Sequence, residues 1–256
     1  MIRGENLFKS FDDVEVIKGV DINFEAGKTN LIIGRSGAGK TVMLKMLVGL
    51  IKPTSGNVYY NDVDFYSLDK KATRAIRMEV GMLFQGSALF DSLTVNENIR
   101  FPLDMFTNMS KAEKQKRVDY TLERVGLVGS NDKYPSEVSG GMQKRVGIAR
   151  SIVLKPKYLF ADEPNSGLDP KTSLVIDELI RSITIENNMT TVINTHDMNS
   201  VLEIGDSIAL LKDGHLVWTG SKDEVLTSRD ENINDFIFAS PFLKKIRDQS
   251  YDPGEV

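Results

Sequence analysis

The sequence contains no cysteine and has no long hydrophobic run. Without cysteine there are no disulfide frameworks, thiolate zinc sites, iron–sulfur ligands or cysteine nucleophiles. The longest apolar stretches are strand-sized, well below the roughly 18 residues that a membrane-spanning helix needs. The N-terminal stretch is too charged for a signal peptide. We therefore expect a cytoplasmic protein that meets any membrane through a partner.

Excess positive charge is also missing. Lysine and arginine total 32 against 36 acidic residues, which gives a net charge of -4. This balance disfavours a broad nucleic-acid surface, so no nucleic-acid partner is expected. The 256 residues, 41% of them hydrophobic, suffice for one large domain or a core with a smaller lobe.

The apolar pattern alternates between strand and helix periods along much of the chain. The predicted order is a strand at 20–24, a buried strand at 31–33, a helix at 44–51, a hairpin at 57–66, a strand at 80–84, mostly helix over 86–155, a strand at 158–161, a helix from Asp169-Pro170, a strand at 191–193 and a hairpin at 208–218. Alternating strands and helices indicate an α/β fold with a mostly parallel sheet.

The segment GRSGAGKT, from Gly34 to Thr41, fits the phosphate-loop pattern and lies between a predicted buried strand and a predicted helix. Its glycines let backbone N–H groups point at phosphate oxygens, and the helix adds its positive end. Lys40 would reach the β- and γ-phosphates, and the Thr41 hydroxyl would hold Mg²⁺. The remaining residues of the predicted phosphate site are Gly34, Ser36, Gly37, Ala38 and Gly39. A glycine-rich turn that fits the pattern by chance is the alternative.

Polar residues follow three further predicted strands. In an open parallel sheet, ligands collect at the carboxyl ends of the strands. Asp162 is placed there to approach Mg²⁺, and Glu163 to polarise a water for attack on the γ-phosphorus. By the same logic His196 would contact the γ-phosphate, and Gln85 would bind Mg²⁺ or the attacking water. Any one of these residues alone would be read as an ordinary surface residue.

A second anion-binding segment precedes another predicted helix. Ser139 is a plausible N-cap, and Gly140 and Gly141 leave bare backbone N–H groups at the positive helix end. An ordinary capped helix is the alternative. We call residues 139–141 the signature segment.

Together these motifs resemble the ATP-binding cassette (ABC) family over roughly residues 5–220. The matching positions are Phe11, Gly34 to Thr41, Gln85, the signature segment, Asp162-Glu163, residues 166–169 and His196. The resemblance implies a P-loop NTPase with a homodimer that sandwiches ATP and Mg²⁺ between the phosphate loop of one copy and the signature segment of the other. It further implies that Ser139 and Gly141 contact the γ-phosphate in trans, that Phe11 stacks on adenine, and that Asp169 belongs to the nucleotide site.

The resemblance also implies a domain organisation. Residues 1–85 and 156–220 would form the ATP-binding core with an N-terminal antiparallel β part, and residues 86–155 an inserted helical subdomain. Residues 221–256 would form an amphipathic tail, with apolar positions at Ile233, Phe236, Ile237, Phe242, Leu243 and Ile246. The tail either folds back on its own core or clasps a second subunit, and the pattern does not separate the two.

Two positions depart from the usual signature: Val138 and Met142 stand where most family members have Leu and Gln. Met142 and residues 81–95 look most like the ATPase of Mla/MCE-type transporters, which move phospholipids. That implies a membrane permease, an MCE-type lipid-binding component and a location on the inner face of the plasma membrane. Leu89, Phe90 and Leu93 would receive a permease helix or simply pack locally. The alternative function is a soluble ABC ATPase of a cytosolic assembly system, such as an iron–sulfur cluster scaffold.

Overall fold

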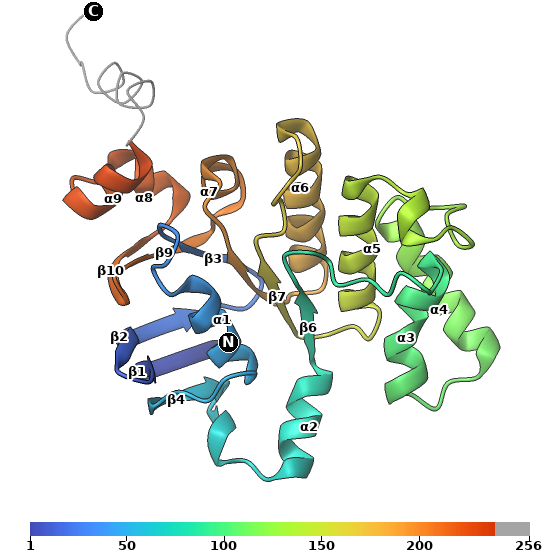
Figure 1. Cartoon of the computed structure of the whole chain (residues 1–256), viewed down its shortest axis with the longest axis horizontal. Coiled ribbons are helices and arrows are strands. Elements are labelled where there is room, and N and C mark those ends of the chain that lie inside the picture. Colours follow the sequence, from blue (N-terminus) through green and yellow to red (C-terminus); the bar gives the residue numbers. More distant parts are fainter. Residues whose placement is uncertain (239–256) are drawn as a thin grey trace, which may run out of the picture.

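The computed structural model describes residues 1–238, which form two sheets and the helices around them (Figure 1). The strands are β1 (Ile2–Phe11), β2 (Val14–Phe24), β3 (Thr29–Ile33), β4 (Ser55–Tyr60), β5 (Val63–Asp64), β6 (Val80–Leu83), β7 (Tyr158–Asp162), β8 (Thr190–Asn194), β9 (Ser207–Lys212) and β10 (His215–Gly220). The helices are α1 (Lys40–Val48), α2 (Lys70–Met78), α3 (Val95–Phe106), α4 (Lys111–Arg124), α5 (Gly140–Ile152), α6 (Pro170–Glu186), α7 (Met198–Ile204), α8 (Lys222–Thr227) and α9 (Glu231–Ile237), with single 3₁₀ turns at Phe65–Ser67 and Pro135–Glu137.

The larger sheet has six strands in the order β10-β9-β3-β8-β7-β6. Its strands run parallel except β10, which pairs antiparallel with β9. The smaller sheet, β2-β1-β4-β5, is antiparallel throughout. The predicted α/β fold, with a mostly parallel sheet and an antiparallel part near the N-terminus, is confirmed.

The six-stranded sheet separates two hydrophobic cores, because successive side chains of a strand point to opposite faces. In β7, Tyr158 and Phe160 join the core that contains α1 and the smaller sheet. Leu159 and Ala161 join the core that contains α3 to α7. Helix α1 is therefore packed between the two sheets, which fixes the loop that precedes it.

Helix α1 is shorter than predicted. Gly49 adopts φ 81 and its N–H donates to the carbonyls of Lys45 and Met46, which ends the helix at Val48. Ile51 lies beyond the helix, so the prediction of helix through residue 51 is wrong. The apolar spacing continues past the end because Ile51 still packs against the same core.

Strand β1 and helices α2, α7 and α8 were not predicted from the sequence. Helix α2 has no fully buried residue and packs against the core through the partly buried Ile76. Strand β1 shows register shifts against both of its neighbours, which break the regular alternation of apolar and polar side chains. The other predicted features that can be checked, including the capping box of Ser110 and Glu113, are present.

Helices α8 and α9 fold back on their own chain. Ile233 and Ile237 are 0% and 2% exposed and belong to the core of the larger sheet. Phe242, Leu243 and Ile246 lie outside the described residues, and the domain boundaries stay predictions. Within residues 1–238, no helix has both the length and the hydropathy to cross a bilayer.

The packing of α1 leads to a stability prediction. Leu44→Ala should lower the free energy of unfolding by about 2–5 kcal/mol, because Leu44 is fully buried between the sheets and its truncation leaves a cavity. Leu50→Ala, just after the helix and 54% exposed, is the matched control and should change it by less than about 0.5 kcal/mol. Denaturant unfolding measures both, and equal effects would contradict this position for α1.

Candidate active site

The loop between β3 and α1 has a backbone that only glycines permit. Gly34, Gly37 and Gly39 have φ values of +150°, +83° and +101°. A Cβ on Gly34 would lie 2.3 Å from the carbonyl oxygen of Leu211, whereas one on Gly37 would meet nothing within 4 Å. Gly39 caps α1 without a side-chain hydrogen bond. The positive end of α1 therefore opens into a curled loop, the arrangement that accepts phosphate.

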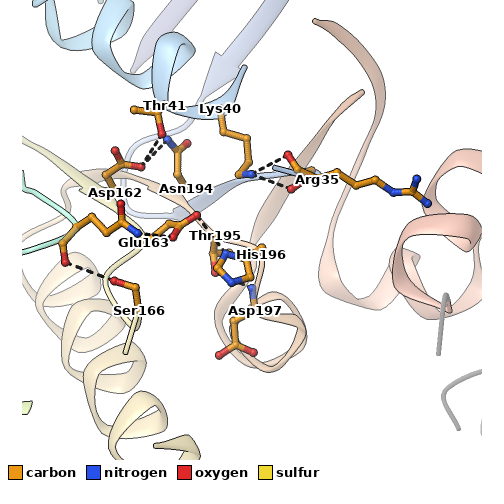
Figure 2. Close-up of polar contacts among 12 residues, drawn as sticks. Arg35, Lys40, Thr41, Asp162, Glu163, Ser166, Asn194, Thr195, His196 and Asp197 are labelled. Carbon is orange, nitrogen blue, oxygen red and sulfur yellow. Dashed lines mark hydrogen bonds and ion pairs between the residues drawn. The ribbon is translucent and has the colours of Figure 1, made fainter. Parts of the chain in front are cut away.

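Lys40 is held in the middle of this loop (Figure 2). Its side chain is 7% exposed, and Nζ donates to the carbonyl oxygens of Gly34 at 2.8 Å and Arg35 at 3.1 Å. Burial lowers the pKa of Lys40, while the nearby carboxylates of Glu163 and Asp162 act in the opposite direction. A phosphate would offer this cation an ionised partner in place of two neutral carbonyls, and charged hydrogen bonds are the stronger kind.

The carboxyl ends of β7 and β8 meet the start of α1. Asp162 and Asn194 lie opposite each other in the parallel register of the two strands. Asp162 Oδ1 accepts hydrogen bonds from Thr41 Oγ1 at 3.2 Å and from Asn194 Nδ2 at 3.1 Å (Figure 2). The predicted pair of Thr41 and Asp162 is thus brought together.

These residues fit Mg²⁺. A hydroxyl and a carboxylate are hard oxygen ligands, and Mg²⁺ is commonly held by one or two such groups together with substrate phosphates and water. In the described part of the chain, no three His, Asp or Glu side chains gather as a metal site of their own. A magnesium ion here would accordingly depend on the nucleotide.

Glu163 follows Asp162, and both its backbone N–H and its two carboxylate oxygens have polar contacts. Its backbone has φ 47, a left-handed conformation uncommon for residues other than glycine, and its N–H donates to the Asn194 carbonyl at 3.0 Å. Gln85 Nε2 donates to one carboxylate oxygen at 3.0 Å. His196 Nδ1 lies 3.1 Å from the other (Figure 2). The three residues predicted to act on the γ-phosphate side are therefore in contact.

Two neighbours of these residues were missed. Asn194 is the last residue of β8, and its place at the strand end is the signal that could have found it. Lys144 of α5 is buried and donates to the Gln85 carbonyl and to Ser166 Oγ, the latter at 3.3 Å. No sequence signal marks Lys144, because a lysine within a helix is normally solvated.

The signature segment lies apart from the phosphate loop of the same chain. Ser139 caps α5 by accepting the Met142 N–H at 3.3 Å, as predicted, and both Ser139 and Gly140 are exposed. Gly140 lines a cavity of about 550 Å³ together with Gln85 and residues 166–168. Residues 35–38 line a different cavity, of about 360 Å³, against the β9–β10 turn and α9. The phosphate loop and the signature segment therefore line different cavities of one chain.

The two remaining predicted residues lie at the edges of these sites. Phe11 is 43% exposed, and Lys9 Nζ lies 4.9 Å from its ring centroid. Phe11 pairs with Val14 at the end of the β1–β2 hairpin. The carbonyl oxygen of Val16, two residues further along β2, would lie 3.1 Å from a Cβ at Gly39. Phe11 is therefore at the end of the smaller sheet that faces the phosphate loop. Asp169 caps α6 through Thr172, whose hydrogen bonds lower the pKa of Asp169.

Residues 17–166 match the family described as ABC transporter. The chain belongs to the ABC transporter family. Its curated relatives include the probable ribonucleotide transport ATP-binding protein mkl of Mycobacterium leprae, 36% identical over 236 residues that cover 92% of this chain and 68% of mkl. The methionine import ATP-binding protein MetN of Corynebacterium diphtheriae is 39% identical over 236 residues, covering 91% of this chain and 69% of MetN.

Solved structures agree with this family. The ATP-binding cassette MJ0796, solved as a dimer in a post-hydrolysis state with ADP and Pi, has a TM-score of 0.78 at 33% identity, covering 87% of this chain and 99% of that one. The cassette cbiO1 of Clostridium perfringens, part of the ABC transporter complex cbiONQ, has a TM-score of 0.83 at 29% identity, covering 96% and 98%. This ABC ATPase binds ATP with Mg²⁺ and hydrolyses it.

Lys40 offers a direct test of the phosphate loop. Lys40→Ala should weaken ATP binding by about tenfold to a hundredfold, the usual value of a hydrogen bond to a charged group, measured by titration calorimetry. Lys45→Ala, on the same helix but one turn further from the loop, is the matched control and should bind ATP as the wild type does. Unchanged affinity in Lys40→Ala would contradict the phosphate-loop assignment.

Proposed function

We propose that this chain is the ATP-hydrolysing subunit of a transporter that moves phospholipid, and that it works as a homodimer closing on two ATP molecules. The homodimer is proposed because the phosphate loop and the signature segment are separate and line different cavities of one chain. A second copy placed head to tail supplies each phosphate loop with a facing signature segment. The dimeric state of the MJ0796 cassette supports this arrangement.

In this proposal each contact of the site has a task in hydrolysis. Lys40 balances the β- and γ-phosphate charge, and Thr41 and Asp162 hold Mg²⁺, with Gln85 as a further ligand of the ion or of the attacking water. Bound Mg²⁺ neutralises the charge that develops on the phosphate oxygens. Glu163 takes a proton from the attacking water, because its carboxylate is held in place by Gln85 and His196.

The remaining predicted residues contact the nucleotide or hold the loop that follows Glu163. Ser139 and Gly141 of the second copy contact the γ-phosphate, so attack awaits closure of the dimer. Asp169 lies in the loop that follows Glu163, and its tie to Thr172 anchors that loop at α6. Phe11 stacks on adenine with the face that Lys9 leaves open.

Glu163→Gln tests the role of the base. The substitution keeps the shape of the side chain but removes its basicity, so ATP hydrolysis should fall at least about a hundredfold while ATP affinity stays close to wild type. Steady-state phosphate release and ATP titration give the two quantities. Asp213→Asn, on the β9–β10 turn, is the control for loss of a carboxylate near the phosphate loop. Wild-type turnover in Glu163→Gln would remove Glu163 from this role.

Coupling to a membrane permease is supported by a cavity of about 960 Å³ between α2, α3 and β6. Its wall is rich in aromatic side chains that are partly exposed, at 40% for Phe84, 42% for Phe90 and 44% for Phe106. Basic side chains of α2 and α5 lie beside them: Lys70, Arg74, Arg77 and Arg150. An apolar groove of this kind accepts an amphipathic helix. Phe90, but not its neighbour Leu89, lines the groove; Leu89 packs against the core.

For the cargo, the proposal depends on Met142 and residues 81–95, whose pattern resembles MCE-type phospholipid transporters. It includes an MCE-type lipid-binding partner and a position on the cytoplasmic face of the inner membrane, held there by the permease. The relatives mkl and MetN carry names for ribonucleotide and methionine transport. Both names denote transport, which disfavours the alternative of a soluble assembly ATPase.

Purification of the tagged chain from its own membranes in mild detergent tests the partner. A permease and a lipid-binding subunit should co-purify with the wild type and be lost from Phe106→Asp, because a charge in the groove opposes a docked apolar helix. Val128→Asp, 77% exposed and outside the groove, is the matched control. Retention of the permease by Phe106→Asp would contradict the groove as its binding site.

The same complex tests the cargo. Reconstituted in vesicles, it should move a fluorescent phospholipid in an ATP-dependent manner, and phospholipid should stimulate its ATPase activity. Methionine and ribonucleotides serve as the competing cargoes, and their ATP-dependent uptake without phospholipid movement would overturn the lipid assignment. Recovery of the chain with soluble proteins alone would favour the cytosolic alternative.

A further inference from the structure

A buried carboxylate is hydrogen-bonded to residues that follow Glu163 and His196 in the sequence. Asp177 of α6 is 1% exposed. One of its oxygens accepts Asn165 Nδ2 at 2.8 Å and the other accepts Ser200 Oγ at 2.8 Å. Asn165 Nδ2 also donates to Ser200 Oγ at 3.1 Å, and both residues are buried. We call Asp177, Asn165 and Ser200 the Asp177 cluster.

The cluster joins the two segments that carry the hydrolysis site. Asn165 comes two residues after Glu163, in the loop that leads to α6. Ser200 lies in α7, which begins two residues after His196. Glu163 Oε1 and His196 Nδ1 lie 3.1 Å apart. The two segments are therefore connected twice: once by the exposed pair and once by a buried carboxylate that accepts a donor from each.

Within residues 1–238, no cation compensates the charge of Asp177. Burial raises the pKa of Asp177 to about 6, while the hydrogen bonds from Ser200 and Asn165 oppose the rise. The charged groups that act on it, Asp197 at the N-cap of α7 and Glu203 within α7, are both negative and raise the pKa further. A buried carboxylate without a positive partner is costly, so the fold gains nothing in stability from its charge. The carboxylate supplies two acceptor oxygens, one for Asn165 in the loop after Glu163 and one for Ser200 in α7.

The orientation of Asn165 depends on this carboxylate. Asn165 Oδ1 is buried and has no hydrogen-bond partner among residues 1–238, so only the Nδ2 bonds to Asp177 and Ser200 fix the amide. Once protonated, Asp177 would present a donor as well as an acceptor, and the unsatisfied Oδ1 would compete for it. The ionised carboxylate is the form that holds both segments as they stand.

We propose that Asp177 is a positioning residue for ATP hydrolysis, holding the loop after Glu163 against the helix after His196 through Asn165 and Ser200. The Glu163 carboxylate and the His196 ring are thereby kept in register for the attacking water. The inference rests on the roles proposed above for Glu163 and His196. Asp177 makes no contact with the phosphate loop, so ATP binding is independent of it.

Asp177→Asn in the full chain is the test. The isosteric amide cannot accept at both positions, so kcat should fall about tenfold or more, the scale of a slightly misplaced catalytic group, while KM for ATP changes less than twofold. Ser200→Ala, which removes one donor, should give a smaller fall in kcat. Glu178→Gln, the neighbouring exposed carboxylate on α6, is the matched control and should keep wild-type kcat.

Two further readouts separate positioning from a structural role. Since the pKa of Asp177 is raised from 3.8 to about 6, its contribution to stability is present at low pH and is lost as pH rises through about 6. Asp177→Asn should therefore keep or raise Tm at pH 7.5, relative to the wild type. The ratio of wild-type to Asp177→Asn kcat should fall towards one below about pH 6, where Asp177 is protonated; taking the ratio cancels the pH dependence that both proteins share.

The outcomes are distinct. A kcat of Asp177→Asn within twofold of wild type overturns the inference, as does a fall in kcat that tracks a lowered Tm or a raised KM. A ratio independent of pH overturns it as well. If Glu163→Gln keeps full turnover, the proposed site itself fails; if Glu163→Gln loses turnover and Asp177→Asn does not, only the role of Asp177 fails.

Discussion

The parallel register of β7 and β8 is the constraint on which the site depends. It sets Asp162 opposite Asn194, and residues just beyond each strand end then fall beside one another. Glu163 and His196 meet for this reason, and Thr41 joins them because β3 pairs with β8 and delivers α1 to the same edge. A slip of one residue in this pairing would send Asp162 to the opposite face of the sheet.

Much of the site could be predicted because its residues follow strand ends or form a contiguous loop. Glycine spacing marks residues 34–41, and buried apolar runs mark the strands before Gln85, Glu163 and His196. The Asp177 cluster could not be found this way. Its contacts bridge 12, 23 and 35 residues, and an aspartate or serine inside a helix carries no local mark of its partner. Such contacts exist only once the helices pack.

The fold was predictable to a similar degree and for a similar reason. The strands of the larger sheet are short apolar runs covered on both faces, so composition alone indicates them. Helix α2 is short and has no fully buried residue, and the register shifts of strand β1 interrupt its alternation, so neither was predicted. The end of α1 was misplaced because Gly49, and not the proline that follows it, stops the helix.

Helix α5 links the two surfaces on which the proposed transport cycle depends. Its first residues belong to the signature segment, and Arg150, in its last turn, lines the aromatic groove between α2 and α3. A rigid helix of 13 residues spans roughly 20 Å. In the proposed dimer, a movement of the signature segment towards the partner's nucleotide would reach the groove along this helix.

Helix α9 has a practical consequence for how small a working version of this ATPase can be. Asn232, Asp235 and Phe236 form a wall of the cavity whose other wall is the phosphate loop. The predicted ATP-binding core ends at residue 220, which suggests a boundary there, although the match to mkl covers 92% of the chain. A chain cut at residue 220 would remove one wall of this cavity and bare the apolar edge that Ile233 and Ile237 now cover, so the minimal autonomous unit extends at least through α9.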